Sequence, residues 1–327
     1  MNDGKASPED RSRPPKRMPN AAITGGLIGS ILLGLSLASL DPGPALAAGM
    51  INAVGVENEY ADVVSQIGGP YVHVTAIETN PNTDPHTFEA SPKVAAELAA
   101  AALIVENGLG YDSWADKMIA AAAGKNRKVI NVQHLLGLSD STPNPHLWYD
   151  PKTMPAVASA VAGTLATLDP GQAGYFQANV RKFDASLKSW MTAIASFKAR
   201  YGATPVAVTE PVADYMLQAV GCDIMTPFNL QAAIMNGTDP SPQDVTTQDG
   251  LFNGRKVKVF LYNQQVTDTL TQSFLGLARK NGIPVVGVYE TMPTGYHYQS
   301  WMMAEVAALR KAVTDKVSTE RLQAPGQ

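Results

Sequence analysis

Cysteine is almost absent from this chain of 327 residues, and Cys222 is the only one. A single cysteine excludes an intramolecular disulfide and a metal cluster held by thiolates. It lies far from the N-terminal segment, so a lipid-anchored form is not predicted either. The role left for this thiol is to fill part of the core.

Basic runs are also scarce. Lysine and arginine number 25 against 29 aspartates and glutamates, which gives a net charge of −4, and no basic run follows Arg17. Binding to nucleic acid depends on clustered positive charge, so no nucleic-acid partner is predicted. The chain beyond its N-terminal segment also lacks a short-period repeat and a low-complexity stretch.

The N-terminal segment has the composition of an export signal. A basic start is followed by an uncharged apolar run, residues 21–40, and then by the small-residue sequence Ala45-Leu46-Ala47-Ala48. This order predicts a signal peptide over residues 1–47 and a mature protein that is periplasmic or otherwise extracytoplasmic. The alternative is an uncleaved membrane anchor, because about 20 apolar residues can span a bilayer.

Two later stretches alternate strand and helix signals, which is typical of an α/β fold with parallel sheets. In the first stretch, the predicted strands are 51–56, 72–77, 103–105 and 129–132, and the predicted helices are 59–67, 92–101 and 114–123. In the second, the strands are 206–209, 257–262 and 285–288, and the helices are 212–219, 269–281 and 298–317. Ser91-Pro92 and Asp150-Pro151 each read as an N-cap followed by proline at the first helical position, and Ser241-Pro242-Gln243-Asp244 reads as a helix start with an acid in the first turn. We therefore expect two Rossmann-like lobes.

A long amphipathic segment separates the two stretches. Its large apolar residues, among them Phe176, Phe183, Trp190 and Phe197, recur at three- and four-residue steps. A helix over residues 171–201 would be roughly 45 Å long, which is enough to connect two lobes rigidly. The predicted division is an N-terminal metal-binding lobe over 48–168, a linker helix over 169–202 and a C-terminal metal-binding lobe over 203–327. The alternative is a surface helix of one larger domain.

Four metal-capable side chains end or follow predicted strands: His86, His146, Glu210 and Glu290. Ligands of open α/β sheets bind beyond the carboxyl ends of the strands, so two facing lobes would bring these side chains to one cleft. Two imidazoles and two carboxylates suit a first-row divalent ion. A shell supplied wholly by the protein is typical of a carrier, because catalysis generally needs an open coordination position.

Several motifs give the chain a family resemblance. They are the segments 84–89 (DPHTFE), 107–114 (NGLGYDSW), 144–148 (NPHLW) and 239–242 (DPSP). On these motifs the chain resembles the cluster A-I solute receptors of zinc and manganese ABC importers over nearly all of its mature length. The resemblance implies that His86 and His146 are ligands from the N-terminal lobe. It places Glu210 at the third ligand, a histidine in zinc-type members and a glutamate in manganese-type ones.

Two departures from the family pattern stand out. Glu290 occupies the position at which the family usually has an aspartate, and the chain lacks the loop rich in histidine and aspartate of many zinc-type members. His297, seven residues after Glu290, is expected either to support the site or to lie on the surface. The aromatic residues Trp148, Tyr149, Tyr289 and Tyr298 either wall the cleft from water or pack in the core.

The expected protein is thus a monomeric, non-enzymatic receptor that carries one zinc or manganese ion to the membrane permease of an ABC importer. Glu210 favours manganese slightly, whereas the Irving–Williams order favours zinc. A metallohydrolase with Glu210 or Glu290 as general base is one alternative, and a surface adhesin is another. A receptor for an organic solute is less consistent with the two Pro-His pairs.

Overall fold

A computed structural model describes residues 49–122 and 126–323. The predicted signal peptide, residues 1–47, lies outside this range and stays a prediction. Within the described part of the chain, none of the helices has the length and apolar character needed to cross a membrane.

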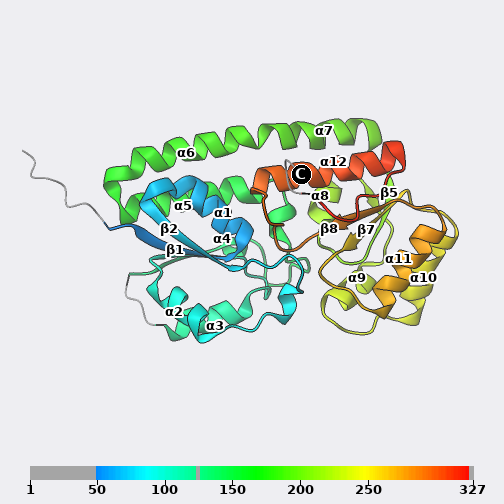
Figure 1. Ribbon diagram of the computed structural model, residues 1–327, viewed down its shortest axis with the longest axis horizontal. Helices are drawn as coiled ribbons and strands as arrows, with labels where there is room; N and C mark the ends of the chain where they lie inside the picture. The colour runs from blue at the N-terminus through cyan, green and yellow to red at the C-terminus, as the bar shows by residue number, and fades with distance from the viewer. Residues whose placement is uncertain (1–48, 123–125, 324–327) are drawn as a thin grey trace, which may run out of the picture. The chain divides into compact units, whose positions relative to one another are not determined.

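The first lobe, which we call the N-lobe, is built on a parallel sheet of four strands in the order β2-β1-β3-β4 (Figure 1). Its strands are β1 (Ile51–Glu57), β2 (Val72–Glu78), β3 (Leu103–Glu106) and β4 (Lys128–Asn131), and its helices are α1 (Asn58–Gly68), α2 (Pro92–Ala100), α3 (Ser113–Ala121), α4 (Val132–Leu135) and α5 (Thr153–Leu168). β3 is buried along its whole length, as expected of a central strand covered on both faces. The predicted parallel sheet is confirmed.

The second lobe, the C-lobe, repeats this topology with the order β6-β5-β7-β8, again all parallel. Its strands are β5 (Pro205–Val208), β6 (Asp223–Ile224), β7 (Val259–Asn263) and β8 (Val285–Val288), and its helices are α8 (Asp214–Ala219), α9 (Phe228–Met235), α10 (Pro242–Asn253), α11 (Thr269–Lys280) and α12 (Tyr298–Asp315). The sequence patterns missed β6 and α9, because a two-residue edge strand and an eight-residue helix give little periodicity.

Two of the three predicted proline-led helix starts are confirmed. The Ser91 hydroxyl accepts the backbone N–H of Val94, and the Ser241 hydroxyl accepts that of Asp244. The third prediction is wrong, because α5 begins at Thr153. There the Asp150 carboxylate accepts the backbone N–H of Lys152 at 3.0 Å and closes a turn ahead of the helix.

The segment between the lobes forms two helices that meet at Leu187, α6 (Ala173–Ser186) and α7 (Lys188–Tyr201), where the sequence predicted one. Leu187 keeps a right-handed helical conformation and donates its N–H to the Phe183 carbonyl at 3.2 Å, so the helical direction continues through the junction. α6 packs on α1 and α5 of the N-lobe, and α7 packs on α12 of the C-lobe. Figure 1 shows the pair running along both lobes.

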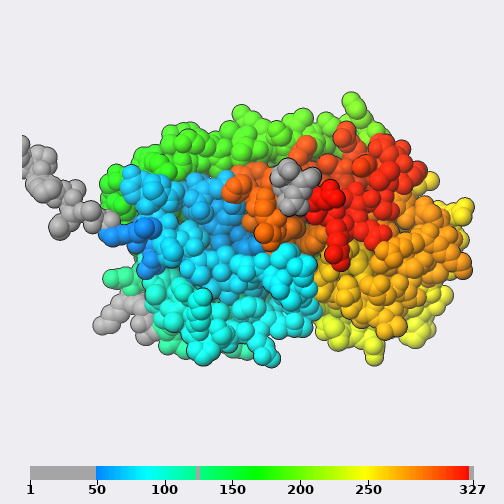
Figure 2. All heavy atoms as spheres, viewed as in Figure 1, coloured from blue at the N-terminus to red at the C-terminus, as the bar shows by residue number. Residues whose placement is uncertain are grey.

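The lobes contact each other through a polar stripe on α1, which consists of Asn58, Asp62 and Gln66 at four-residue steps. The N-lobe and the C-lobe meet on the face shown in Figure 2. The stripe binds the segment that precedes and begins α12. The Asn58 amide forms two hydrogen bonds of 2.9 Å with the Met292 backbone, and the Tyr298 N–H donates to Asp62 at 2.9 Å. The side-chain amides of Gln66 and Gln299 also bind each other. This segment follows Glu290 directly, so its contacts with the stripe also restrict the backbone next to this candidate ligand.

A buried acid, Glu305, lies beneath the same junction. Its Oε1 accepts the Trp301 indole N–H at 3.0 Å and the hydroxyl of Tyr149, an N-lobe residue, at 3.4 Å. Its Oε2 has no hydrogen-bond partner among the described residues. Burial raises the pKa of the Glu305 carboxyl to about 8, so the folded protein favours its protonated form.

Replacing this carboxyl by an amide should therefore change how stability depends on pH. The folded pKa lies above the unfolded value near 4.5, so the stability that Glu305 contributes at low pH is lost as pH rises through 8. We expect Glu305→Gln to raise the free energy of unfolding at pH 9 by on the order of 2 kcal/mol, with no gain at pH 4. Urea unfolding at both pH values measures this. Glu97→Gln, on half-buried α2, is the matched control, and an equal gain there would contradict the prediction.

Candidate metal site

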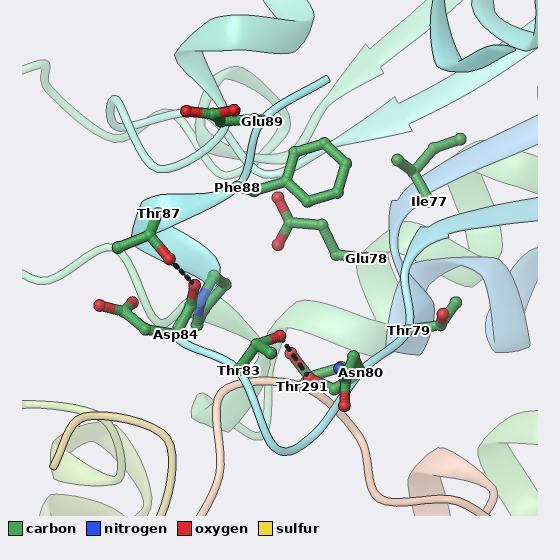
Figure 3. A pocket seen from close by; sticks show the side chains of 11 residues that line it. Ile77, Glu78, Thr79, Asn80, Thr83, Asp84, Thr87, Phe88, Glu89 and Thr291 are labelled. Atoms are coloured by element: carbon green, nitrogen blue, oxygen red, sulfur yellow. Dashed lines mark hydrogen bonds between the residues drawn. The ribbon is translucent and has the colours of Figure 1, made fainter. Parts of the chain in front are cut away.

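His86 lies in the loop between β2 and α2, within a short 3-10 turn (Pro85–Thr87). The Asp84 carboxylate accepts the backbone N–H of His86 at 2.8 Å. The Thr87 hydroxyl donates to the Asp84 carbonyl at 2.8 Å (Figure 3). Pro85 fixes the backbone between them. The His86 imidazole is therefore presented from a tight turn, with 23 % of its side chain exposed.

His146 is fully buried and held by Asn144. The Asn144 amide donates to the Pro211 carbonyl of the C-lobe at 2.8 Å, so its Oδ1 is the atom that faces the histidine, 3.0 Å from the backbone N–H and 2.8 Å from Nδ1. An acceptor at this position favours the tautomer with hydrogen on Nδ1. The Nε2 of His146 is then left with its lone pair directed away from Asn144. Asn107 fixes the loop by donating to the Pro145 carbonyl at 2.8 Å.

Glu290 follows β8 and brings the two histidines together. Its Oε2 lies 3.1 Å from His86 Nε2 and 3.2 Å from His146 Nε2. Ligand atoms of the three side chains all lie within 4.8 Å of one another, which is compact enough to hold a metal ion. The Tyr111 hydroxyl donates to the same oxygen at 3.1 Å, and the Gln265 side chain accepts the Glu290 N–H at 2.7 Å.

Glu210 lies just after β5 and is 2 % exposed. It is outside that group of three but is connected to it by Asn263, whose amide donates to Glu210 Oε1 at 3.1 Å and to Glu290 Oε1 at 2.7 Å. Glu210 Oε2 is buried without a hydrogen-bond partner among the described residues. Thus three of the four predicted side chains converge. The fourth, Glu210, is linked to them through Asn263, and its Oε2 has no hydrogen-bond partner among the described residues.

The charges of the two glutamates differ. Burial raises the pKa of Glu290, but the hydrogen bonds and charges of His146 and His86 lower it by more, so the pKa ends well below the usual range and the group is ionised. Burial raises the pKa of Glu210 well above its usual value, and the neighbouring Glu290 charge adds to this effect. A cation placed between the two carboxylates would offset the burial of Glu210 and its repulsion by the Glu290 charge.

The histidines differ in the same way. Burial lowers the pKa of His86, but its contact with Glu290 outweighs this and the pKa rises; for fully buried His146 the burial effect prevails and the pKa falls. The hydrogen bond from His146 to Glu290 requires a proton on Nε2, whereas Asn144 favours the hydrogen on Nδ1 and burial lowers the pKa of the ring. Without a proton on Nε2, its lone pair faces the Glu290 carboxylate, and two electron-pair donors in a buried site repel unless a cation lies between them. The donor set therefore fits a divalent transition metal, with nitrogen and oxygen ligands.

Further acids end three strands of the N-lobe: Glu57 on β1, Glu78 on β2 and Glu106 on β3. Burial raises the pKa of Glu78 to about 8 and that of Glu106 to about 7, and it raises that of Glu57 well above its usual value. Glu78 lines a cavity of about 420 Å³ beside the His86 loop, where its carboxyl lies near the ring of Phe88 (Figure 3). Burial therefore disfavours the charged form of these acids, whereas the two imidazoles favour the charged form of Glu290.

His86 also lines a cleft of about 550 Å³, so this member of the group of three is reached from the cleft. The N-lobe contributes the loop 84–87 to this cleft, and the C-lobe contributes 234–237 and 265–268. Gln265 connects the two sides, because its amide donates to the Thr83 carbonyl of the N-lobe at 2.7 Å. The site therefore lies where the loops of both lobes meet, as predicted for a cleft between them.

The remaining expectations have mixed outcomes. The side chain of His297 is 74 % exposed and contacts Asp62 at 2.7 Å, so it belongs to the lobe junction. Trp148 is buried with its ring 5.4 Å from that of His146, which makes it part of both the core and the wall of the site. Asn263 and Gln265 were missed, since an amide at the end of a strand carries no metal-ligand signal by itself.

This arrangement has a match among known families. The profile of the family described as "Zinc-uptake complex component A periplasmic" matches residues 57–312. The chain belongs to this family. The resemblance to metal-binding solute receptors is thereby confirmed, and the matched range covers all four candidate ligands and every strand except β1, of which it includes only Glu57.

Individual relatives of this family member are distant. A putative metal-binding protein of Treponema pallidum is 22 % identical over 211 residues, which are 57 % of this chain and 66 % of that protein, just under two thirds. The solved periplasmic zinc-binding protein TroA of T. pallidum aligns with a TM-score of 0.69 at 18 % identity over 83 % of this chain and all of that one. A Mn-bound mutant of the periplasmic metal-binding protein from candidatus Liberibacter asiaticus aligns with a TM-score of 0.64 at 18 % identity. The alignment covers 80 % of this chain and 99 % of that one. The fold is thus shared.

Removing the hydrogen bond from Asn144 to His146 should weaken metal binding. Without the Oδ1 acceptor the His146 ring loses its fixed tautomer and orientation, which for such supporting groups lowers affinity about 10- to 100-fold. We expect this loss for Asn144→Ala in zinc titrations. Asn253→Ala, at the exposed end of α10, should bind as the wild type does. Equal affinity of Asn144→Ala and wild type would show that the hydrogen bond is irrelevant to the site.

Proposed function

We propose that this protein is a solute-binding receptor that captures one divalent transition-metal ion, zinc or manganese, and delivers it to the permease of an ABC importer. The observation that carries the proposal is the meeting of His86 Nε2, His146 Nε2 and Glu290 Oε2 within 4.8 Å, from two different lobes. Membership of a family described as a zinc-uptake component supports it. The metal here is cargo, not a resident cofactor.

The proposed ligands are His86, His146, Glu210 and Glu290. Glu210 would complete the shell through Oε2, which has no hydrogen-bond partner among the described residues, after a movement of the side chain towards the other three. With four protein ligands the ion has no position left for a substrate, which is the reason to propose a carrier and not an enzyme. His86, as the ligand that faces the cleft, is the first that an entering ion meets.

The two-lobed organisation gives the receptor a way to signal that it is loaded. In the proposed division, the N-lobe (48–168) supplies both histidines and the C-lobe (203–327) supplies both glutamates, with the linker (169–202) between them. An ion bound by all four side chains favours the docked arrangement of the lobes by its higher affinity for that arrangement. The permease would recognise this arrangement in a monomeric receptor.

Titration with zinc and manganese tests the proposal. We expect the double variant His86→Ala, His146→Ala to lose at least about 100-fold in affinity, because two imidazole ligands of a four-ligand shell are gone. Isothermal titration calorimetry on purified protein measures this. Binding by the double variant as tight as that of wild type would place the metal elsewhere.

The matched control is His73→Ala, His134→Ala, which removes two exposed histidines of the same lobe. Its affinity should equal that of wild type. A loss of similar size in this control would mean that surface histidines, and not the proposed site, bind the metal.

The extracytoplasmic location is part of the proposal and depends on residues 1–47. The apolar run and the small residues at 45–48 lead us to expect that the exported protein begins at Ala48. Mass spectrometry of the protein recovered from the periplasm or medium determines its N-terminus. Recovery of the whole chain in the membrane fraction would favour the retained anchor.

A further inference from the structure

Asn263 is the residue that contacts both proposed glutamate ligands. It ends β7, and the strand order β5-β7-β8 places it between the strand that leads to Glu210 and the strand that leads to Glu290. It is fully buried. Its backbone N–H donates to the Thr209 hydroxyl at 3.0 Å, which fixes it beside Glu210.

The orientation of its amide follows from its neighbours. The Asn263 Oδ1 accepts the backbone N–H of Gln265 at 3.0 Å, so the NH₂ group faces the carboxylates. That group has two hydrogens, and one is used by Glu210 Oε1 and the other by Glu290 Oε1. The amide is therefore saturated by one oxygen from each glutamate.

The other oxygen of each glutamate remains for the metal. Glu290 Oε2 lies against both imidazoles, and Glu210 Oε2 is buried with no hydrogen-bond partner among the described residues. The Tyr111 hydroxyl occupies a further acceptor direction of Glu290 Oε2 at 3.1 Å. Each Oε1 keeps a second lone pair, but the Asn263 amide fixes its position. To face one ion with both oxygens, either carboxylate would have to turn, which lengthens its bond to Asn263 and leaves a buried donor poorly paired.

We infer that Asn263 holds Glu210 and Glu290 as one-oxygen ligands and thereby selects a four-coordinate ion, zinc, over manganese. The inference deepens the proposed function and depends on it. Two imidazole nitrogens and two carboxylate oxygens make a set of four ligands, and zinc prefers four ligands in tetrahedral geometry. Manganese takes a larger set of oxygen ligands, and two-oxygen carboxylates are the means by which four side chains could supply it.

Substitution of Asn263 separates this role from mere support of the fold. Asn263→Ala leaves both Oε1 atoms without their donor and with space to turn towards the ion. Asn263→Ser, with one donor, can retain one of the two bonds. Asn281→Ala is the matched control, because the Asn281 amide also donates one hydrogen bond, to the Leu277 carbonyl at 2.9 Å, but at the end of α11. Thermal unfolding followed by circular dichroism identifies any variant that does not fold.

Two readouts are combined: zinc and manganese affinities by competition titration, and the visible spectrum with Co²⁺ as a probe of coordination number. We expect wild type and Asn281→Ala to give the intense Co²⁺ absorption of a tetrahedral site. Asn263→Ala should give the weak absorption of a five- or six-coordinate ion and lower the zinc-to-manganese affinity ratio about tenfold or more. Asn263→Ser should lie between the two, and it serves as the test if the alanine variant does not fold.

Three results would count against the inference. A wild-type spectrum of higher coordination overturns it, and so does an Asn263 variant with unchanged spectrum and unchanged affinity ratio. If an Asn263 variant loses affinity equally for zinc and manganese and keeps a tetrahedral Co²⁺ spectrum, Asn263 does not select between the metals and only supports the site. Failure of the wild type to bind any of the three metals is a different outcome, because it overturns the proposed function itself.

Discussion

The buried carboxylate of Glu290 is the group around which the rest of the site is arranged. An ionised carboxylate without exposure to water needs charged or hydrogen-bonding partners on every side. His86 and His146 supply these from the N-lobe, while Asn263 supplies one from the C-lobe. Because the partners come from both lobes, the same interactions stabilise the charge of Glu290 and the contact between the lobes.

Side-chain amides surround the proposed ligands. Asn144, Asn263 and Gln265 each use both ends of the side-chain amide, with a carbonyl oxygen towards one neighbour and an NH₂ group towards another. An amide carries no charge, so it can orient a carboxylate or an imidazole without competing for the metal. His146 and Glu290 are therefore fixed in direction by Asn144, Asn263 and Gln265, which reduces the reorganisation that would accompany binding of an ion.

Much of the fold could be predicted from the sequence, because apolar runs such as Val285–Val288 and capped starts such as Ser241 are local signals. His86 and His146 could be singled out for a similar reason, since each follows a proline in a loop beyond a strand. The role of Asn263 could not, because it depends on the strand order β5-β7-β8, which local patterns do not specify. Glu210 is predicted as the third ligand, whereas in the structure it lies outside the group of three and is joined to Glu290 through Asn263.

The helical pair α6 and α7 has a mechanical consequence. α7 rises about 21 Å from the Leu187 junction to its end on the C-lobe, so a change of direction of about 3° there displaces that end by about 1 Å. Metal–ligand distances tolerate only about 0.2 Å. A bend of this size would therefore move the C-lobe side chains away from those of the N-lobe by more than a shared metal ion tolerates.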